Sequence, residues 1–414
     1  MSITRPAAEL QAPLIEGDGR PSRARRAVIA LLGGLRSGCV RMVCPDGATQ
    51  DLGRGAPLAQ LLIHDESVFG HTLAYGDIGF AECWMDGRWS VDDLPALLTL
   101  LARDREVIAQ GLHGQALFLL GHRLWTLLRA NTRRGARRNI EAHYDLGNDF
   151  YRLWLDATMT YSSAFFGEGA GSGAGSVALE QAQRAKVRRM LERAGVQAGE
   201  RVLEIGCGWG GLAEIAATEF GAQVHGITLS PSQLAYAQAR AADGGWAERA
   251  TFELRDYRDV EQHYDRVVSC EMFEAVGERY WPSFFAQLAR CLKPGGRTVV
   301  QTITIRDDIF PVYRKGTDFI QRYIFPGGKL PSPSVFVRLA GEAGLRVDGD
   351  LAFGPDYART LAEWDRRFVA AHDTLLKMGY DERFCRMWRF YLAYCEAGFS
   401  AGVIDVHQFE LVHA

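Results

Sequence analysis

The run 201–211, Arg-Val-Leu-Glu-Ile-Gly-Cys-Gly-Trp-Gly-Gly, has residue types and a spacing that suit ligand binding. Its glycines are Gly206, Gly208, Gly210 and Gly211. Glycine lets the backbone approach a ligand closely, because no side chain intervenes. The apolar stretch 202–205, which includes Glu204, predicts a buried strand, and 212–219 predicts the helix that follows the turn. Doubly wound sheets bind nucleotides at the carboxyl end of such a strand, and a dinucleotide is the usual ligand.

A second predicted strand, 223–228, ends at Thr228 and is followed by Leu-Ser-Pro-Ser-Gln. Ser230 has the position of a helix N-cap, Pro231 the first helical position and Gln233 the third, which is the pattern of a capping box. These residues therefore have a structural explanation that holds with or without a ligand.

Composition narrows the class of protein. With 414 residues, of which 47% are hydrophobic, the chain can bury one large core or two. The net charge of −3 gives no reason to expect nucleic acid as a partner. Eight cysteines without a C-x-x-C pair or a His/Cys cluster predict reduced thiols, a cytoplasmic protein and no metal site. No apolar run reaches the roughly 18 residues of a spanning helix, and 23–35 predicts an amphipathic helix rather than a signal peptide.

Turn signals and composition divide the chain into four parts. We expect a mobile N-terminus over 1–22, a small mixed α+β domain over 23–118, a basic linker over 119–140 and the glycine-turn domain over 141–414. In the small domain, strands are predicted at 40–43, 50–52 and 58–64, and a helix at 91–101 with two aspartates in its first turn. In the large domain, helices are predicted at 178–194, 358–379 and 381–400, and a closing antiparallel strand at 403–412.

The segment 119–140 contains six arginines and no acid: Arg123, Arg129, Arg133, Arg134, Arg137 and Arg138. One interpretation is a solvated linker between the domains. The other is a membrane-surface element, because each cation near anionic lipid contributes about 1 kcal/mol. Residues 167–176 are rich in glycine and serine and predict a flexible lid beside the ligand site.

The order of the motifs resembles that of class I methyltransferases that use S-adenosylmethionine (SAM). More specifically, the chain resembles the cyclopropane fatty acid synthases and the mycolic acid cyclopropane synthases over about 135–412. The motifs that carry this resemblance are His143-Tyr-Asp-Leu-Gly-Asn148, Tyr161-Ser162, the glycine turn, Thr228-Leu-Ser-Pro-Ser-Gln233, Met272-Phe-Glu-Ala-Val-Gly277, Tyr323-Ile-Phe-Pro-Gly-Gly328 and Phe353-Gly-Pro-Asp-Tyr357. Residues 76–90 are also similar to the N-terminal lipid-binding domain of the bacterial synthases.

The resemblance implies a Rossmann-like sheet of seven strands, the last one antiparallel, and SAM as the methyl donor. It places the amino acid part of SAM at the glycine turn, where the positions concerned are Glu204, Gly206, Gly208 and Gly210. Thr228 and Gln233 would contact the ligand, Asp256 would lie by the adenine, and Tyr161 and Ser162 would close over the methionine part.

The resemblance also implies a mechanism. Methylation of an alkene leaves a carbocation on the acyl chain, and a bound bicarbonate then takes a proton from the new methyl group so that the ring closes. In the family this anion is held by a Glu, a His, a Tyr and backbone groups near a Cys and an Ile. Matching the motifs assigns these positions to Glu274, Gln301, Tyr357, Ser163 and Ile303. Two of them depart from the family, since Ser163 replaces the Cys and Gln301 replaces the His, and an amide cannot take up a proton at neutral pH.

The expected function is thus SAM-dependent conversion of a cis double bond in a phospholipid acyl chain to a cyclopropane. The enzyme would work in the cytoplasm at the inner face of the membrane. Bicarbonate would be a second small ligand, and the sequence leaves open whether the protein forms a homodimer. Gln301 keeps a second product open, a methyl or methylene branch, for which the cation loses a neighbouring chain proton instead of closing the ring. Two further alternatives are a non-catalytic lipid-binding protein and a small-molecule methyltransferase.

The arginine segment yields the first prediction. Neutralising four of its six arginines is expected to weaken binding to anionic vesicles and to make the residual binding less sensitive to salt, because screening acts on exposed charges. Activity on detergent-solubilised lipid should survive. Vesicle sedimentation measures the effect, and unchanged sedimentation would identify the segment as a linker only.

Overall fold

The computed structural model describes residues 21–111, 146–167 and 178–414. The six arginines, the predicted lid and the predicted mobile N-terminus lie outside these ranges, apart from residues 21–22 and 167. Among the described residues, no helix has the length and apolar character needed to span a membrane.

The N-terminal domain is a four-stranded sheet packed with helices, as predicted. Its elements are α1 (Arg23–Gly33), β1 (Cys39–Val43), β2 (Thr49–Gly53), β3 (Pro57–Ile63), α2 (Ser67–Met85), β4 (Trp89–Val91), α3 (Leu94–Arg103) and α4 (Arg105–Gly111). The strand order is β2-β1-β3-β4, with β1 and β3 parallel. The helix predicted at 91–101 begins later, at Leu94, because the Asp93 side chain caps it by accepting a hydrogen bond from the Ala96 amide. Asp92 and Asp93 therefore precede the first turn instead of lying in it.

The large domain is a seven-stranded sheet in the order β10-β11-β9-β8-β5-β6-β7. The strands are β5 (Arg201–Ile205), β6 (Gln223–Thr228), β7 (Ala250–Leu254), β8 (Tyr264–Cys270), β9 (Leu292–Ile305), β10 (Leu345–Ala352) and β11 (Ile404–His413). Only β11 is antiparallel to its neighbours β9 and β10, which confirms the predicted closing strand. The chain winds from β5 through β6 to β7 and then returns to place β8 on the other side of β5. Such a reversal creates a crevice at the carboxyl ends of the central strands.

Helices cover both the sheet and the crevice. They are α7 (Asn148–Arg152), α8 (Leu179–Ala194), α9 (Gly211–Thr218), α10 (Pro231–Asp243), α11 (Trp281–Cys291), α12 (Phe310–Tyr313), α13 (Pro333–Glu342), α14 (Gly354–Ala370), α15 (His372–Lys377) and α16 (Glu382–Ser400), with short 3-10 turns η1 (Ala247–Arg249), η2 (Tyr257–Asp259), η3 (Phe273–Ala275) and η4 (Glu278–Tyr280) and a π-helical turn η5 (Ile320–Ile324). The helix predicted at 358–379 is in fact two helices, α14 and α15.

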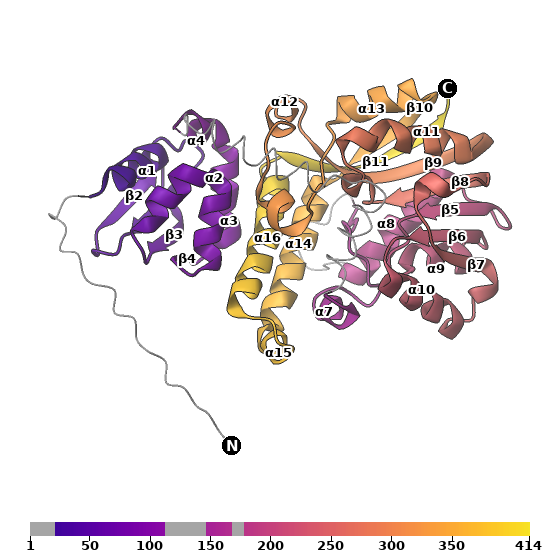
Figure 1. The fold of residues 1–414 in the computed structure, drawn as a ribbon, viewed down its shortest axis with the longest axis horizontal. Coiled ribbons are helices and arrows are strands. Elements are labelled where there is room, and N and C mark those ends of the chain that lie inside the picture. Colours follow the sequence, from indigo (N-terminus) through magenta and orange to yellow (C-terminus); the bar gives the residue numbers. More distant parts are fainter. Residues whose placement is uncertain (1–20, 112–145, 168–177) are drawn as a thin grey trace, which may run out of the picture.

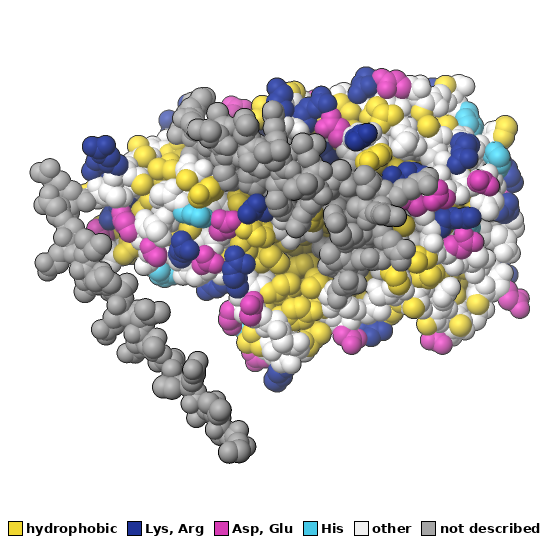
Figure 2. Space-filling view, in the orientation of Figure 1, with side chains coloured by type: hydrophobic (Ala, Val, Ile, Leu, Met, Phe, Trp, Pro, Cys, Tyr) yellow, Lys and Arg dark blue, Asp and Glu magenta, His cyan; other side chains and the backbone are white. Residues whose placement is uncertain are grey.

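The two domains share one apolar core. Helices α14 and α16 stand between the N-terminal domain and the sheet (Figure 1), and α16 packs against both α2 and α3. The Trp84 indole of α2 donates to the Arg386 carbonyl of α16 at 2.9 Å, and Tyr323 donates to the Glu82 carboxylate at 2.5 Å. On the face shown in Figure 2, hydrophobic side chains gather in the middle of the molecule, and charged side chains of both signs are interspersed around them.

Candidate functional site

The glycine turn follows β5 and lines a cavity of about 820 Å³. Gly206, Gly208 and Gly210 all have positive φ, at +86°, +51° and +81°, which side chains disfavour. A Cβ on Gly206 would lie 2.9 Å from Met272, and one on Gly210 would lie 3.2 Å from Ala237, so these two glycines allow close packing within the protein. A Cβ on Gly208 would meet nothing within 4 Å. Gly208 is therefore the position where the missing side chain leaves room for a ligand.

Glu204 places a buried carboxyl group beside this turn. Its side chain is buried, lines the cavity and leaves Oε2 without a hydrogen-bond partner among the described residues. Burial raises its pKa well above the usual value for a carboxyl group, whereas the nearby charge of Lys186 acts in the opposite direction. An unpartnered buried carboxylate oxygen next to an open glycine turn fits the ammonium group of an amino acid, as the end of SAM provides.

The second strand end supports the same crevice. Ser230 caps α10 by accepting from the Gln233 amide at 3.3 Å, which confirms the predicted N-cap. A full capping box also needs the Gln233 side chain to accept from the Ser230 backbone N–H. That part of the prediction is wrong, because the Gln233 side chain accepts from the Thr228 hydroxyl at 2.9 Å instead. Thr228 and Gln233 both line the cavity, so their paired polar atoms lie where the resemblance expects ligand contacts.

Asp256, the residue expected beside the adenine, is paired with an arginine and does not line the cavity. It follows β7, but Arg258 donates to both of its carboxylate oxygens, at 2.8 and 2.6 Å. Among the described residues that line the cavity are its neighbours Arg255 and Tyr257, and not Asp256 itself. Its contact with adenine stays a prediction.

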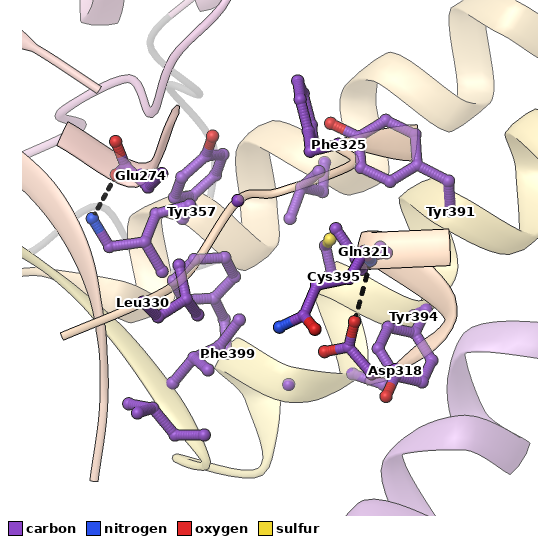
Figure 3. Close-up of a pocket in the computed structure, with 18 of the residues that line it drawn as sticks. Glu274, Asp318, Gln321, Phe325, Leu330, Tyr357, Tyr391, Tyr394, Cys395 and Phe399 are labelled. Carbon is purple, nitrogen blue, oxygen red and sulfur yellow. Dashed lines mark hydrogen bonds between the residues drawn. The ribbon is translucent and has the colours of Figure 1, made fainter. Parts of the chain in front are cut away.

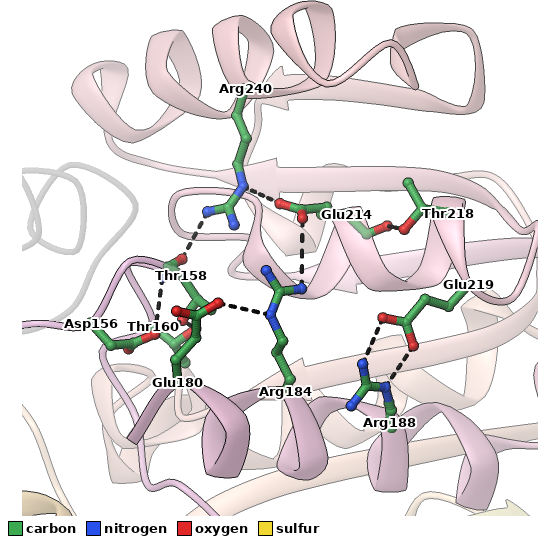
Figure 4. Close-up of polar contacts among 10 residues, drawn as sticks. All are labelled: Asp156, Thr158, Thr160, Glu180, Arg184, Arg188, Glu214, Thr218, Glu219 and Arg240. Atoms are coloured by element: carbon green, nitrogen blue, oxygen red, sulfur yellow. Dashed lines mark hydrogen bonds and ion pairs between the residues drawn. The ribbon is translucent and has the colours of Figure 1, made fainter. Parts of the chain in front are cut away.

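Charged side chains hold segment 156–163, which we call the clasped segment, over the glycine turn (Figure 4). Arg240 of α10 donates to the Thr158 carbonyl at 2.7 Å and to the Glu214 carboxylate at 2.5 Å. Arg184 of α8 lies 3.7 Å from the same carboxylate. Because these groups come from three helices around the crevice, they fix the segment that carries Tyr161 and Ser162.

Tyr161 and Ser162 both line the cavity, as expected for residues that close over SAM. The Tyr161 hydroxyl lies 2.6 Å from that of Tyr391. The Ser162 carbonyl accepts from Gln183 at 2.7 Å, and its hydroxyl accepts from Lys186 at 2.5 Å.

The acid that bonds Tyr357 directly is Glu271, a residue that the motif match did not assign, while the assigned Glu274 lines the same cavity. Glu271 Oε2 accepts from the Tyr357 hydroxyl at 2.5 Å. Its Oε1 accepts from the Gln301 amide at 2.7 Å and from the Ser163 backbone N–H at 2.9 Å. The predicted Tyr, Gln and Ser positions therefore do converge, but on a carboxylate that the sequence analysis missed.

Glu271 also has an unusual backbone conformation. Its φ is +50°, which costs free energy for any residue with a side chain and which is found most often at functional sites. The residue directly follows β8, and its amide donates to the Gln301 carbonyl at 2.8 Å. The available signal was the run Ser269-Cys270-Glu271 at the end of the apolar stretch that forms β8, since polar residues at carboxyl strand ends face the crevice.

A relay of amides fixes how Gln301 is oriented. The Arg189 guanidinium donates to the Gln408 side-chain oxygen, and Gln408 donates to the Gln301 oxygen at 2.9 Å. Because arginine can only donate, each amide in the chain must turn its NH₂ group toward the next acceptor. The last NH₂ group faces Glu271, so the relay favours a negatively charged carboxylate there.

Glu274 occupies a neighbouring position in the same cavity (Figure 3). Its Oε1 accepts from the Ile303 amide at 2.6 Å and from the Thr302 hydroxyl at 3.0 Å, and Oε2 has no partner among the described residues. Burial, followed by repulsion from Glu271, raises the pKa of Glu274 to about 8. Two buried carboxyl groups this close cannot both ionise readily. Burial also raises the pKa of Glu271, but the three donors around Glu271 favour its charged form, whereas Glu274 holds a proton at neutral pH.

Lys186 is a further residue that the sequence analysis missed. It is a fully buried cation on α8 that lines the cavity. Its ammonium group lies 3.3 Å from the Cys270 sulfur and 2.5 Å from the Ser162 hydroxyl. Burial raises the pKa of both Glu204 and Glu271, and the charge of Lys186 opposes that rise. A lysine on the apolar face of the helix predicted at 178–194 was the available signal.

Comparisons with known proteins place these features in a family. The mycolic acid cyclopropane synthetase family matches residues 131–409. Tuberculostearic acid methyltransferase UfaA1 of Mycobacterium tuberculosis is 42% identical over 90% of this chain and 87% of its own. Cyclopropane-fatty-acyl-phospholipid synthase of Escherichia coli is 34% identical over 86% of this chain and 88% of its own. The crystal structure of mycolic acid cyclopropane synthase CmaA1 with SAH and CTAB aligns with a TM-score of 0.61 and 32% identity over 66% of this chain and 97% of that chain.

The turn yields the second prediction. Gly208→Val is expected to abolish binding of S-adenosylhomocysteine, because the new side chain fills the open space and its φ of +51° is strained. The control is Gly199→Val, where φ is +82° and a Cβ also meets nothing, but the residue lies outside the cavity. Calorimetric titration compares the two folded variants, and normal affinity of the Gly208 variant would contradict the assignment of the SAM site.

Proposed function

Because this chain belongs to the mycolic acid cyclopropane synthetase family and is a SAM-dependent methyltransferase, we propose that it methylates the cis double bond of an unsaturated acyl chain of a membrane phospholipid to give a cyclopropane. The observation that carries the proposal is the carboxylate of Glu271, held by three donors in the cavity that the glycine turn lines. We propose further that Glu271 is the proton acceptor of the reaction.

Different residues of the site would bind SAM, close over it and position the acyl chain. SAM, when bound, supplies an electrophilic methyl group. The glycine turn and Glu204 hold its amino acid end, and the clasped segment closes over it. Apolar and aromatic walls keep the acyl double bond in line and exclude water, and such positioning contributes about 7–11 kcal/mol in well-oriented reactions.

Proton removal then decides the product. The π electrons of the alkene would form the new carbon–carbon bond to the donor methyl group while the sulfur–methyl bond breaks and leaves its electron pair on sulfur. The neighbouring chain carbon then becomes positive. Glu271 accepts a proton from the new methyl group, and the released C–H electron pair closes the ring. Glu271 is suited to this because it is charged, fixed and already in the place where the family resemblance expects a bicarbonate. The tyrosine, amide and backbone donors would thus hold a side chain instead of a free anion.

A second product has a specific observation in its favour. The 42% identical relative is named a tuberculostearic acid methyltransferase rather than a cyclopropane synthase. Three hydrogen bonds weaken Glu271 as a base, and slow proton removal would allow a hydride to shift from the methylated carbon to the cationic carbon. Loss of a methyl proton to the same carboxylate would then give a methylene branch.

The role of Glu271 yields the third prediction. Glu271→Gln is expected to lower the rate by about 100-fold or more, because the amide fills the same space but cannot accept the proton. Binding of S-adenosylhomocysteine should persist, as should the rate of the control Glu261→Gln, which changes an exposed carboxylate. Methyl transfer to phospholipid is measured with labelled SAM.

A rescue experiment sharpens the test. Glu271→Gly removes the carboxylate at a φ that glycine tolerates, and added bicarbonate should restore part of its activity by filling the vacated space. The unchanged enzyme should be indifferent to removal of bicarbonate. A wild-type enzyme that stops without bicarbonate would overturn the role of Glu271 as the acceptor.

The product yields the fourth prediction. A cyclopropane and a methylene-branched chain are isomers, so mass cannot distinguish them, but ring protons and vinylic protons resonate far apart. Proton NMR of lipid methylated by the enzyme is expected to show ring protons. Vinylic signals without ring signals would establish the branched product instead, while transfer to the acyl chain would still stand.

A further inference from the structure

The cavity does not end at the catalytic domain. It continues into the N-terminal domain, where α1, β1, β3, α2, α3 and α4 all contribute to its wall. The lining there is almost wholly apolar and includes Leu31, Leu32, Met42, Leu61, Leu98 and Ala102. We call this part the N-terminal chamber and the part around Glu271 the catalytic chamber. An enclosed apolar space of this kind fits a hydrocarbon chain.

Polar side chains mark the junction between the chambers. Asp77 lines the cavity from α2, directly after Gly76, whose φ of +62° and ψ of −135° kink the helix. Its Oδ2 atom accepts from the Tyr394 hydroxyl of α16 at 3.1 Å. On the catalytic side, Asp318 and Gln321 point into the same space as Tyr394 (Figure 3). The cavity therefore has an apolar end in the N-terminal domain and a polar junction where the domains meet. On the catalytic side, apolar walls that include Ile303, Leu330 and Phe399 lie beside the charged groups of the site.

The relatives differ in whether they have the first domain. The synthase structure that is named for mycolic acid matches 97% of its own length but only 66% of this chain, and the family match starts at residue 131. The structure of the mycolic acid synthase therefore has no counterpart of the N-terminal domain. The relative named for fatty-acyl phospholipid matches 86% of this chain, which requires part of that domain. The relative named for tuberculostearic acid likewise matches 90% of this chain, so the extra domain occurs in relatives named for a phospholipid and for a fatty acid.

We infer that the N-terminal chamber takes the second acyl chain of a diacyl phospholipid whose first chain reacts in the catalytic chamber. The inference rests on the proposed function and names its substrate class. A lipid with two chains has two hydrocarbon tails that meet at a polar glycerol ester region. The cavity offers an apolar wall in the N-terminal domain, a polar junction, and further apolar wall residues beside the charged catalytic groups. The polar junction is where that ester region would lie, since a buried polar wall is costly against hydrocarbon alone.

The experiment fills the N-terminal chamber without touching the catalytic one. Ala102 lines the chamber from α3, and Ala102→Trp is compared with Ala27→Trp, which changes an exposed alanine of α1 outside the cavity. Each enzyme is assayed in detergent micelles on a phospholipid with two oleoyl chains and on a lysophospholipid with one. Calorimetry with S-adenosylhomocysteine checks that each variant is folded, and Ala102→Leu replaces the tryptophan variant if that one is not.

The expected result is selective. The unchanged enzyme should prefer the two-chain lipid in kcat/KM by roughly tenfold or more, as apolar pockets discriminate, and Ala102→Trp should abolish that preference by losing activity on the two-chain lipid alone. Ala27→Trp should behave as the unchanged enzyme. Equal activity of the unchanged enzyme on both lipids, or an equal loss on both in Ala102→Trp, would overturn the two-chain assignment. Activity of the unchanged enzyme on neither lipid would instead overturn the proposed function.

Discussion

Keeping a charged carboxylate in a cavity that must exclude water is the constraint on which the arrangement of the large domain depends. Removing a carboxylate from water is costly unless donors replace its hydration. Glu271 receives three such donors from separate parts of the chain, namely segment 156–163, β9 and α14. Lys186, on α8, adds the compensating positive charge. The sheet register, the clasped segment and the packing of α14 must all be correct before the charge can be buried, so the fold and the site stabilise each other.

The same constraint accounts for the polar residues on the neighbouring antiparallel strand. Gln408 of β11 lies directly opposite Gln301 of β9 in the sheet register, and this pairing lets Arg189 act on Glu271 through two amides. A histidine in place of Gln301 could donate to one partner, but it could not continue this amide relay in the same orientation. The strained backbone of Glu271 also indicates that the surrounding residues fix its position, because a residue with a side chain retains a positive φ only where its surroundings enforce it. The site is thus built to hold a resident anion.

The sequence was sufficient for the glycine turn, the strands on either side of it and the Ser230 N-cap, because these depend on local periodicity and on glycine chemistry. The seven-stranded sheet with its antiparallel last strand followed from the family resemblance. The sequence also identified Ser163, Gln301 and Tyr357 as neighbours, although they lie far apart along the chain. It did not identify the second acid, Glu271, which follows β8 three residues before Glu274 and lines the same cavity. Which one faces Tyr357 depends on the backbone turn at Glu271, and motif matching carries no information on that turn. Lys186 was missed for a related reason, since its burial follows from the packing of α8 against the crevice.

Exclusion of water also matters for the hydrocarbon part of the proposed substrate, and the N-terminal domain contributes walls that exclude it. A long-lived cation on the acyl chain is quenched by water, so the chain must be enclosed along its length while the reaction proceeds. In a smaller relative with no such domain, the catalytic domain must enclose its substrate by itself. Here α16 forms a shared wall, with Tyr391 and Phe399 on the catalytic chamber and Tyr394 at the junction (Figure 3). Because one helix borders both chambers, its packing defines the wall of each. One hydrophobic cluster accordingly extends from the N-terminal domain into α14 and α16.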